Sequence, residues 1–213
     1  LKLGAYGFIR FVLPLFPAES SHFAFWLALM AVAAIIFGAL SAAGQTDFKR
    51  LVAYSSINHM GFVVLAIAAA AWVGGSAGEG LRESAVIAVN GAVLQMFNHG
   101  LSAAGMFFLV GVLYDRVHTR DLEKYGGLFT ILPVFGGILL FVSMASLGLP
   151  GLNGFVSEFM IVRGAWPVFT ALTALSMIGL FFTGVYVLKA LKLVLQGPLN
   201  ETWRGKLSDI TLR

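Results

Sequence analysis

The stretch LGLPGLNGFVSEFMIVR, residues 147–163, interrupts a strongly apolar chain and decides how we interpret its fold. A long uncharged run precedes it and ends at Glu158. Pro150 removes a backbone hydrogen-bond donor and clashes with the preceding turn, and the glycines lower helix propensity further. The sequence therefore predicts a helix that is discontinuous near Pro150–Gly154, with Pro150, Gly151 and Gly154 in the break and a carboxylate in apolar surroundings.

The composition predicts an all-α polytopic membrane protein. Of the 213 residues, 59% are hydrophobic and 11% are charged, with a mean hydropathy of +0.89. Soluble domains carry about 25% charged residues. The absence of cysteine excludes disulfides, thiolate metal sites and cysteine nucleophiles. The net charge of +4 is not evidence for nucleic-acid binding, because in a membrane protein the positions of the basic residues indicate the orientation of the spans. We expect lipid around the chain and no nucleic acid.

The hydrophobic segments predict how the chain crosses the bilayer, since about 20 apolar residues form one spanning helix. The chain opens inside an apolar segment and does not begin with Met, so we expect an internal fragment of one membrane domain. The predicted spans are about 1–16 (partial), 22–44, 51–73, 84–114, 128–162 (broken) and 167–195.

The basic residues predict the orientation of these spans. Ten of the 14 Lys and Arg residues fall on alternate connections, on one side of the membrane. The positive-inside rule makes that side cytoplasmic. These ten residues are Lys49, Arg50, Arg116, Arg120, Lys124, Lys189, Lys192, Arg204, Lys206 and Arg213.

Five ionisable residues within or beside the spans are candidates for a functional role, because a charge in a span costs roughly 2.5–3.5 kcal/mol on insertion scales. Glu158 is the strongest, and we expect it to open the second half-helix, where free N–H groups and the helix dipole favour a carboxylate. Such a group takes and releases protons, or else it only caps the helix beside a hydrated cleft. The other four are Lys2, Lys49, His59 and His99.

Each of these four also has a purely structural interpretation. His59 and His99 each follow an asparagine, which suggests a polar lane through two spans, although a lone buried histidine often makes only an interhelical bond. Lys2 is either a lysine that exchanges a proton or one that extends to the membrane surface. Lys49 at a span edge is either a relay group or a positive-inside anchor.

Other kinds of site lack support in the sequence. No two histidines lie at i,i+4 spacing, so we expect no metal site. P-loop, dinucleotide-binding and CxxC motifs are missing, and we expect no catalytic redox group in the chain. Ser102 follows His99 without an orienting acid, which disfavours a hydrolase.

Three long motifs resemble the M-type antiporter-like membrane subunits of respiratory complex I (NADH:quinone oxidoreductase). QTDFKRLVAYSSINHMGFVVLAI is similar to a signature of the antiporter-like subunits. QMFNHGLSAAGMFFLVGVLYDRVHTRD and LGLPGLNGFVSEFMI match the M-type closely, because the related L-type and N-type subunits carry lysine at the position of Glu158. The resemblance covers nearly all of residues 1–195.

The resemblance implies a proton-translocating subunit of about fourteen helices in an antiporter-like helix bundle, of which this chain is about the eighth to the thirteenth. It implies a relay along Lys2, Lys49, His59, His99 and Glu158 that is driven by quinone reduction elsewhere in the complex. The partners implied are the L-type and N-type subunits, and the location is a bacterial inner membrane. FMN, iron–sulfur clusters and quinone are implied for the complex and no cofactor for this chain.

Two alternatives remain open. One is a subunit of a cation/proton antiporter or a hydrogenase-linked ion pump built from the same module. The other is a structural membrane scaffold, in which the polar residues only hold helices together.

Overall fold

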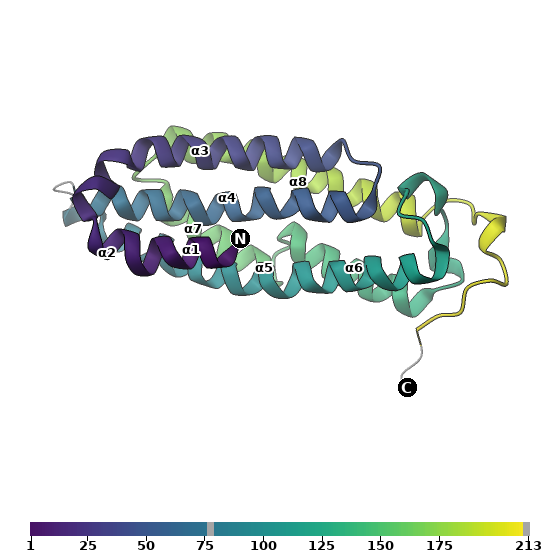
Figure 1. Cartoon of the computed structure of the whole chain (residues 1–213). Helices are drawn as coiled ribbons and strands as arrows, with labels where there is room; N and C mark the ends of the chain where they lie inside the picture. Colours follow the sequence, from purple (N-terminus) through teal and green to yellow (C-terminus); the bar gives the residue numbers. More distant parts are fainter. Residues whose placement is uncertain (76–78, 211–213) are drawn as a thin grey trace.

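The computed structural model describes residues 1–75 and 79–210, and its described part is a bundle of helices whose one β-type pairing is an isolated bridge (Figure 1). The short helices are η1 (a π-helix, Phe8–Val12) and the 3₁₀ turns η2 Glu79–Leu81, η3 Leu122–Lys124, η4 Leu128–Thr130 and η5 Glu201–Trp203. The α-helices are α1 Lys2–Gly7, α2 Leu13–Leu15, α3 Pro17–Ala43, α4 Phe48–Gly75, α5 Arg82–Val117, α6 Pro133–Leu147, α7 Asn153–Ala165 and α8 Thr170–Leu195.

Four of the described helices, α3, α4, α5 and α8, are long and apolar enough to cross a membrane. In its most apolar window α4 is 72% buried, whereas the other three are each 39% buried. Helix α4 is therefore the centre of the bundle, and large apolar side chains on the outer helices, such as Phe37, Phe108 and Phe181, are exposed. In an integral membrane protein such side chains face lipid.

The predicted break is confirmed, and it separates α6 from α7 (Figure 1). Gly148 adopts a left-handed φ of 80°, and the N–H groups of Gly148 and Leu149 bond to the carbonyls of Ala145 and Met144. This is a Schellman ending, which closes α6 before Pro150 prevents its continuation. The half-helices have 15 and 13 residues, or about 22 and 20 Å, so neither alone spans a core of about 30 Å.

One residue assigned to the break lies elsewhere. Gly154 is the second residue of α7 and is buried. A Cβ atom added there would lie 2.2 Å from the carbonyl oxygen of Ala145. The glycine is therefore needed for close approach of the two half-helices, whereas the left-handed backbone of the break falls at Gly148 and Gly151.

Close contact between α5 and α7 positions the second half-helix. A Cβ atom on Gly164 of α7 would lie 2.4 Å from the backbone nitrogen of Ala88 and 2.6 Å from the carbonyl oxygen of Ser84. A Cβ atom on Gly91 of α5 would likewise lie 2.8 Å from the nitrogen of Ile161. Small residues allow such backbone approach in membrane bundles.

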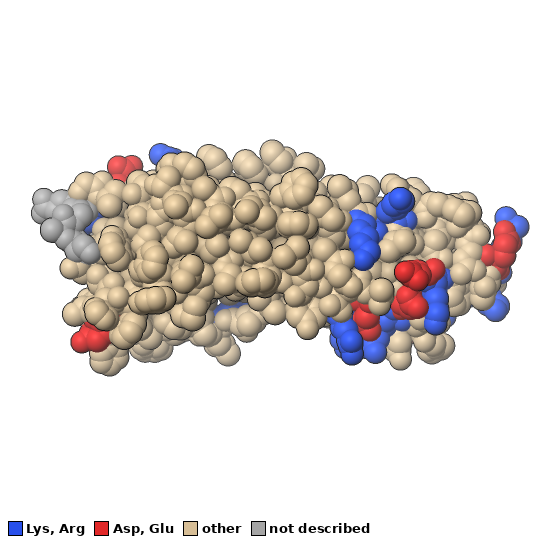
Figure 2. All heavy atoms as spheres, turned by 90° about the horizontal axis from the view of Figure 1, so that it is seen from above, with Lys and Arg blue, Asp and Glu red and all other residues tan. Residues whose placement is uncertain are grey.

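Basic residues gather at the end of the bundle where α3 meets α4 and α5 meets α6, which we call the basic end (Figure 2). Two connections clasp each other there. Phe48 N–H bonds to the Arg120 carbonyl at 2.8 Å, Leu122 N–H bonds to the Thr46 carbonyl at 2.9 Å, and Arg120 Nε lies 3.4 Å from Asp47 Oδ2. Tyr125 packs beneath them, and burial, followed by the nearby carboxylates, raises the pKa of its hydroxyl.

The segment after α8 returns to cap α6. The Asp209 carboxylate accepts hydrogen bonds from the N–H groups of Val134 and Phe135, at 2.7 and 3.0 Å. Desolvation opposes ionisation of Asp209, but the backbone N–H groups outweigh it and lower the pKa of the carboxyl. The C-terminal segment thereby satisfies N–H groups that the start of α6 leaves free.

Candidate functional site

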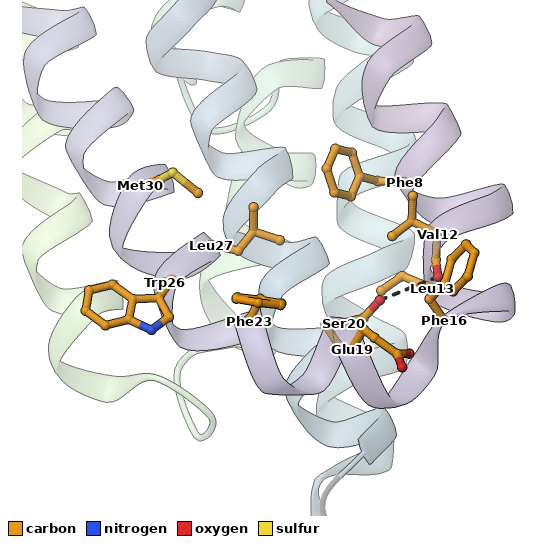
Figure 3. A pocket seen from close by; sticks show the side chains of 11 residues that line it. Phe8, Val12, Leu13, Phe16, Glu19, Ser20, Phe23, Trp26, Leu27 and Met30 are labelled. Carbon is orange, nitrogen blue, oxygen red and sulfur yellow. Dashed lines mark hydrogen bonds between the residues drawn. The ribbon is translucent and has the colours of Figure 1, made fainter.

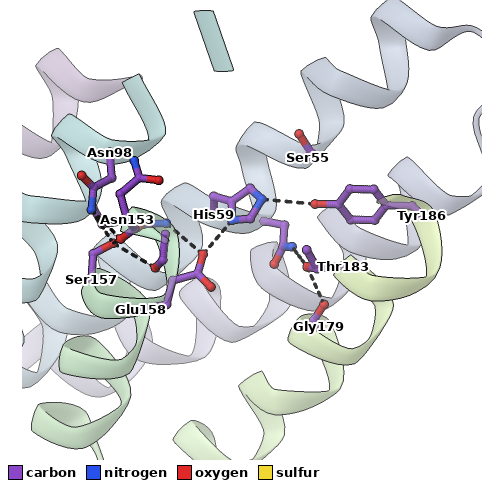
Figure 4. Close-up of polar contacts among 12 residues, drawn as sticks. Ser55, His59, Asn98, Asn153, Ser157, Glu158, Gly179, Thr183 and Tyr186 are labelled. Carbon is purple, nitrogen blue, oxygen red and sulfur yellow. Dashed lines mark hydrogen bonds and ion pairs between the residues drawn. The ribbon is translucent and has the colours of Figure 1, made fainter. Parts of the chain in front are cut away.

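Glu158 is the centre of a buried polar cluster between α4, α5 and α7 (Figure 4). The residue is 5% exposed. Its Oε1 atom lies 2.8 Å from His59 Nδ1 and accepts a hydrogen bond of 2.9 Å from Gln95 Nε2. The expectation that Glu158 opens the half-helix was wrong, because α7 begins at Asn153 and side chains of α4 and α5 contact the carboxylate instead.

His59, on α4, joins Glu158 to Tyr186 of α8. The ring is 2% exposed, and its Nε2 atom lies 3.3 Å from the Tyr186 hydroxyl (Figure 4). Oε1 of Glu158 also accepts from Gln95, so we assign it as the acceptor toward His59 and place the ring proton on Nδ1. Nε2 then accepts from the tyrosine hydroxyl, and a continuous hydrogen-bonded line runs Tyr186–His59–Glu158.

Polar side chains of α5 hold the first turns of α7. Gln95 Oε1 accepts from the Ser157 hydroxyl, which fixes the orientation of the amide whose Nε2 faces Glu158. Asn98 Nδ2 donates to the Asn153 carbonyl at 2.7 Å and to Ser157 Oγ at 3.1 Å. The second half-helix is therefore tied to α5 beside the carboxylate as well as packed against it.

Sequence reasoning did not select Gln95 and Tyr186. A signal for Gln95 exists, since it lies three and four residues before Asn98 and His99, on one face of α5. Tyr186 has no comparable signal. It reaches His59 across 127 residues of sequence, and only the folded bundle brings the two together.

His99 and Lys2 lie beside this cluster. The His99 and His59 ring centroids are 5.1 Å apart, at an angle of 34°. A Cβ atom on Gly100, the neighbour of His99, would lie 4.0 Å from Lys2 Cε. The N-terminus lies partway along the bundle (Figure 1), and α1 begins there at Lys2.

Lys49 is not part of the cluster. It is exposed in the first turn of α4, at the basic end. Ten residues of helix separate it from His59, a rise of about 15 Å. Of the five candidates, the structure brings His59, His99 and Glu158 together, with Lys2 close by.

The helix break lies directly against the carboxylate. A Cβ atom on Gly148 would lie 3.2 Å from Glu158 Oε2, and the left-handed φ at this position also favours glycine. Pro150 and Gly151 follow and are exposed. Non-helical backbone at membrane depth is tolerated where it is buried in protein or lines a hydrated cavity.

An apolar pocket of 410 Å³ between the α1–α2 run and α3 is separate from this cluster (Figure 3). Its lining includes Phe8, Phe23 and Trp26, and Glu19 is its one titratable side chain. It does not include any of the five candidates. Within the described residues no group of three or more His, Cys, Asp or Glu side chains is placed to hold a metal ion.

Fold and cluster together define a class of protein: a polytopic membrane protein with a broken helix and a line of buried ionisable groups. The chain belongs to the family described as NADH:quinone oxidoreductase/Mrp antiporter, transmembrane, whose model matches residues 1–183.

Curated relatives are subunits of NADH-quinone oxidoreductase. The chain is 45% identical over 198 residues to subunit M from Pseudomonas aeruginosa, covering 93% of this chain and 36% of the relative. It is 46% identical over 191 residues to subunit M from Escherichia coli, covering 90% of this chain and 35% of the relative. The chain thus spans about a third of the length of these relatives.

Two solved structures share the fold. Respiratory complex I from Thermus thermophilus with bound NADH contains a chain that matches with a TM-score of 0.86 and 27% identity, over 99% of this chain and 41% of that one. The Mrp complex from Dietzia sp. matches with a TM-score of 0.81 and 18% identity, over 93% and 35%. The second likeness concerns the fold alone.

Proposed function

We propose that this chain is part of a proton-translocating membrane-arm subunit of an NADH:quinone oxidoreductase. The observation that carries the proposal is the buried line Tyr186–His59–Glu158, which contacts the helix break. Similarity to the M subunits of two bacterial enzymes supports the choice of complex.

The chemistry follows from the hydrogen bonds of His59. A proton that arrives at Nε2 makes the ring an imidazolium, and the Nδ1 proton then passes to Glu158 Oε1, 2.8 Å away. Gln95 holds the carboxylate in place for this transfer. Glu158 releases the proton beside Gly148, where the broken backbone accepts water more readily than a continuous helix does.

The proposal also concerns the complex to which this chain would belong. The partners are other membrane-arm subunits of the L and N types, and the location is a bacterial inner membrane. FMN, iron–sulfur clusters and quinone belong to other subunits, and quinone reduction there changes the charge near Lys2. The basic end faces the cytoplasm, because the positive-inside rule puts Lys and Arg on that side.

A cation/proton antiporter remains the second candidate function, because the family model describes both kinds of protein. The distinguishing measurement is proton flux in vesicles that receive either NADH or a sodium gradient. The proposal requires a response to NADH. A response to sodium alone favours the antiporter.

The test of the proposed function is Glu158→Gln in the full-length subunit within its assembled complex. Glutamine keeps the volume and still accepts from His59 and Gln95, so the fold persists, but it does not bind and release a proton. We expect normal assembly and loss of most NADH-driven proton translocation. Glu201→Gln is the control, because this glutamate is exposed and pairs with the exposed Arg204, away from the cluster. If Glu158→Gln pumped protons like the wild type, Glu158 would have only a structural role and the proposed relay would be contradicted.

A further inference from the structure

The line from Lys2 to Glu158 has a gap between the two histidines. Their rings are 5.1 Å apart, and no hydrogen bond joins them among the described contacts. The Nε2 atom of His99 is buried and has no partner within the described part of the chain. A buried nitrogen without a partner is costly, so the site calls for a bridging group.

A small cavity is lined in part by His99. It lies between α4, α5, α6 and α8 and has a volume of about 20 Å³. A water molecule needs at least about 10–15 Å³ and two to four polar partners. The polar side chains around the cavity are Ser55, His99, Ser143, Ser146 and Tyr186.

The lining is suited to a water molecule and not to an apolar guest. Cavities that stay dry are apolar, whereas this one has five polar side chains. The Ser55 hydroxyl donates to the Val52 carbonyl at 2.8 Å, and a hydroxyl oxygen can also accept a hydrogen bond. The volume is enough for one water molecule.

We propose that this cavity holds one water molecule and that this water, with the Tyr186 hydroxyl, passes protons between His99 and His59. Tyr186 lines the cavity and also contacts His59 Nε2 at 3.3 Å, so it belongs to both sides of the gap. This inference rests on the proposed function and adds a route and a residue to it.

The transfer balances step by step. Protonated His99 gives the Nε2 proton to the water, which gives one of its own protons to the Tyr186 oxygen. The tyrosine hydroxyl proton moves to His59 Nε2, and the His59 Nδ1 proton moves to Glu158 Oε1. His99 has then lost one proton and Glu158 has gained one, while water and tyrosine end neutral and His59 has exchanged tautomers.

The first test is a high-resolution cryo-EM map of the assembled complex. We expect density for one water within hydrogen-bond distance of His99 Nε2 and of Tyr186. A well-resolved cavity without such density would overturn the proposal, whatever the pumping assays show.

The second test is Tyr186→Phe, with NADH-driven proton translocation as the readout. Phenylalanine keeps the buried ring and removes the hydroxyl, so we expect the number of protons per NADH to fall to the level of Glu158→Gln. Tyr125→Phe is the matched control, because this tyrosine is also buried but donates to the Thr119 carbonyl at the basic end. Wild-type pumping by Tyr186→Phe would overturn the route.

A second pair of variants tests the cavity if Tyr186→Phe does not assemble. Ser143→Val fills the cavity and should lower pumping, whereas Ala104→Val, at an exposed position of α5 outside the cavity, adds bulk elsewhere and should pump. Equal pumping by the two variants would contradict the route. If Glu158→Gln loses pumping while Tyr186→Phe and Ser143→Val do not, the proposed function stands and only this inference fails.

Discussion

At the scale of the residue, side chains and not a helix terminus determine the surroundings of Glu158. His59 and Gln95 both contact Oε1, while Gly148 leaves space beside Oε2. The carboxylate is thus held on one oxygen and open toward the break on the other. This asymmetry suits a group that receives a proton from the bundle and releases it at the break.

Gln95 provides a test of this arrangement. Replacing Gln95 by Leu removes the donor to Oε1, and a hydrogen bond to a charged group contributes about 1.5–3 kcal/mol. The carboxylate then loses one of its two partners on Oε1, so proton translocation in the full-length complex should fall while assembly persists. Gln45→Leu is the control, since the Gln45 side chain donates to the Ser41 carbonyl at the end of α3, away from the cluster. Unchanged pumping in Gln95→Leu would mean that Gln95 does not position the carboxylate.

Some residues of this site could be predicted from the sequence and others could not. His59, His99 and Glu158 are identifiable because polar groups on apolar spans need a reason. The spacing of Gln95 relative to Asn98 and His99 is a sequence signal for its place in the cluster. The contact of Tyr186 with His59 is not predictable in this way, because it depends on how α8 packs against α4.

At the scale of the element, the break follows from local chemistry and is therefore predictable. Pro150 cannot continue α6, because it lacks a backbone N–H and clashes with the preceding turn, and Gly148 supplies the left-handed residue that a Schellman ending requires. The function of Gly154 is not local, since it depends on the approach of Ala145. The expected position of Glu158 failed for the same kind of reason, because α7 begins five residues earlier, at Asn153.

The contact between α5 and α7 predicts the effect of a substitution at Gly164. Any side chain there meets backbone atoms of Ala88 and Ser84, which do not move aside easily. We expect Gly164→Val to destabilise the subunit by about 1–3 kcal/mol or more, seen as a lower melting temperature or lost assembly. Gly111→Ala on α5 is the control, because open space surrounds that position. Equal stability of the two variants would contradict the packing described.

At the scale of the whole molecule, the charged residues are concentrated at the ends of the bundle. The basic end gathers Lys and Arg, while the middle surface is almost uncharged (Figure 2). Two connections at this end are hydrogen-bonded to each other, and Asp209 caps the start of α6. The basic residues therefore indicate the orientation of the chain in the membrane, and the hydrogen bonds at the same end hold the ends of α4, α5 and α6 together.

This asymmetry predicts which end of the molecule a reagent reaches. The chain has no cysteine, so a single cysteine at Glu123 or at Thr170 gives a clean label in a full-length subunit without other cysteines. Both positions are exposed, at opposite ends of the bundle. We expect a membrane-impermeant reagent added outside intact cells to label Thr170→Cys and not Glu123→Cys. Labelling of Glu123→Cys and not of Thr170→Cys would contradict the predicted orientation.

The most direct test of the relay is a double-variant cycle of proton translocation in the assembled complex. Residues that act as one unit are strongly non-additive, because losing either member already stops the step they share. We expect His59→Gln, Glu158→Gln and the double variant to lose the same amount of NADH-driven proton translocation. Losses that add, or a double variant that pumps much less than either single variant, would contradict a relay through the 2.8 Å contact between His59 and Glu158.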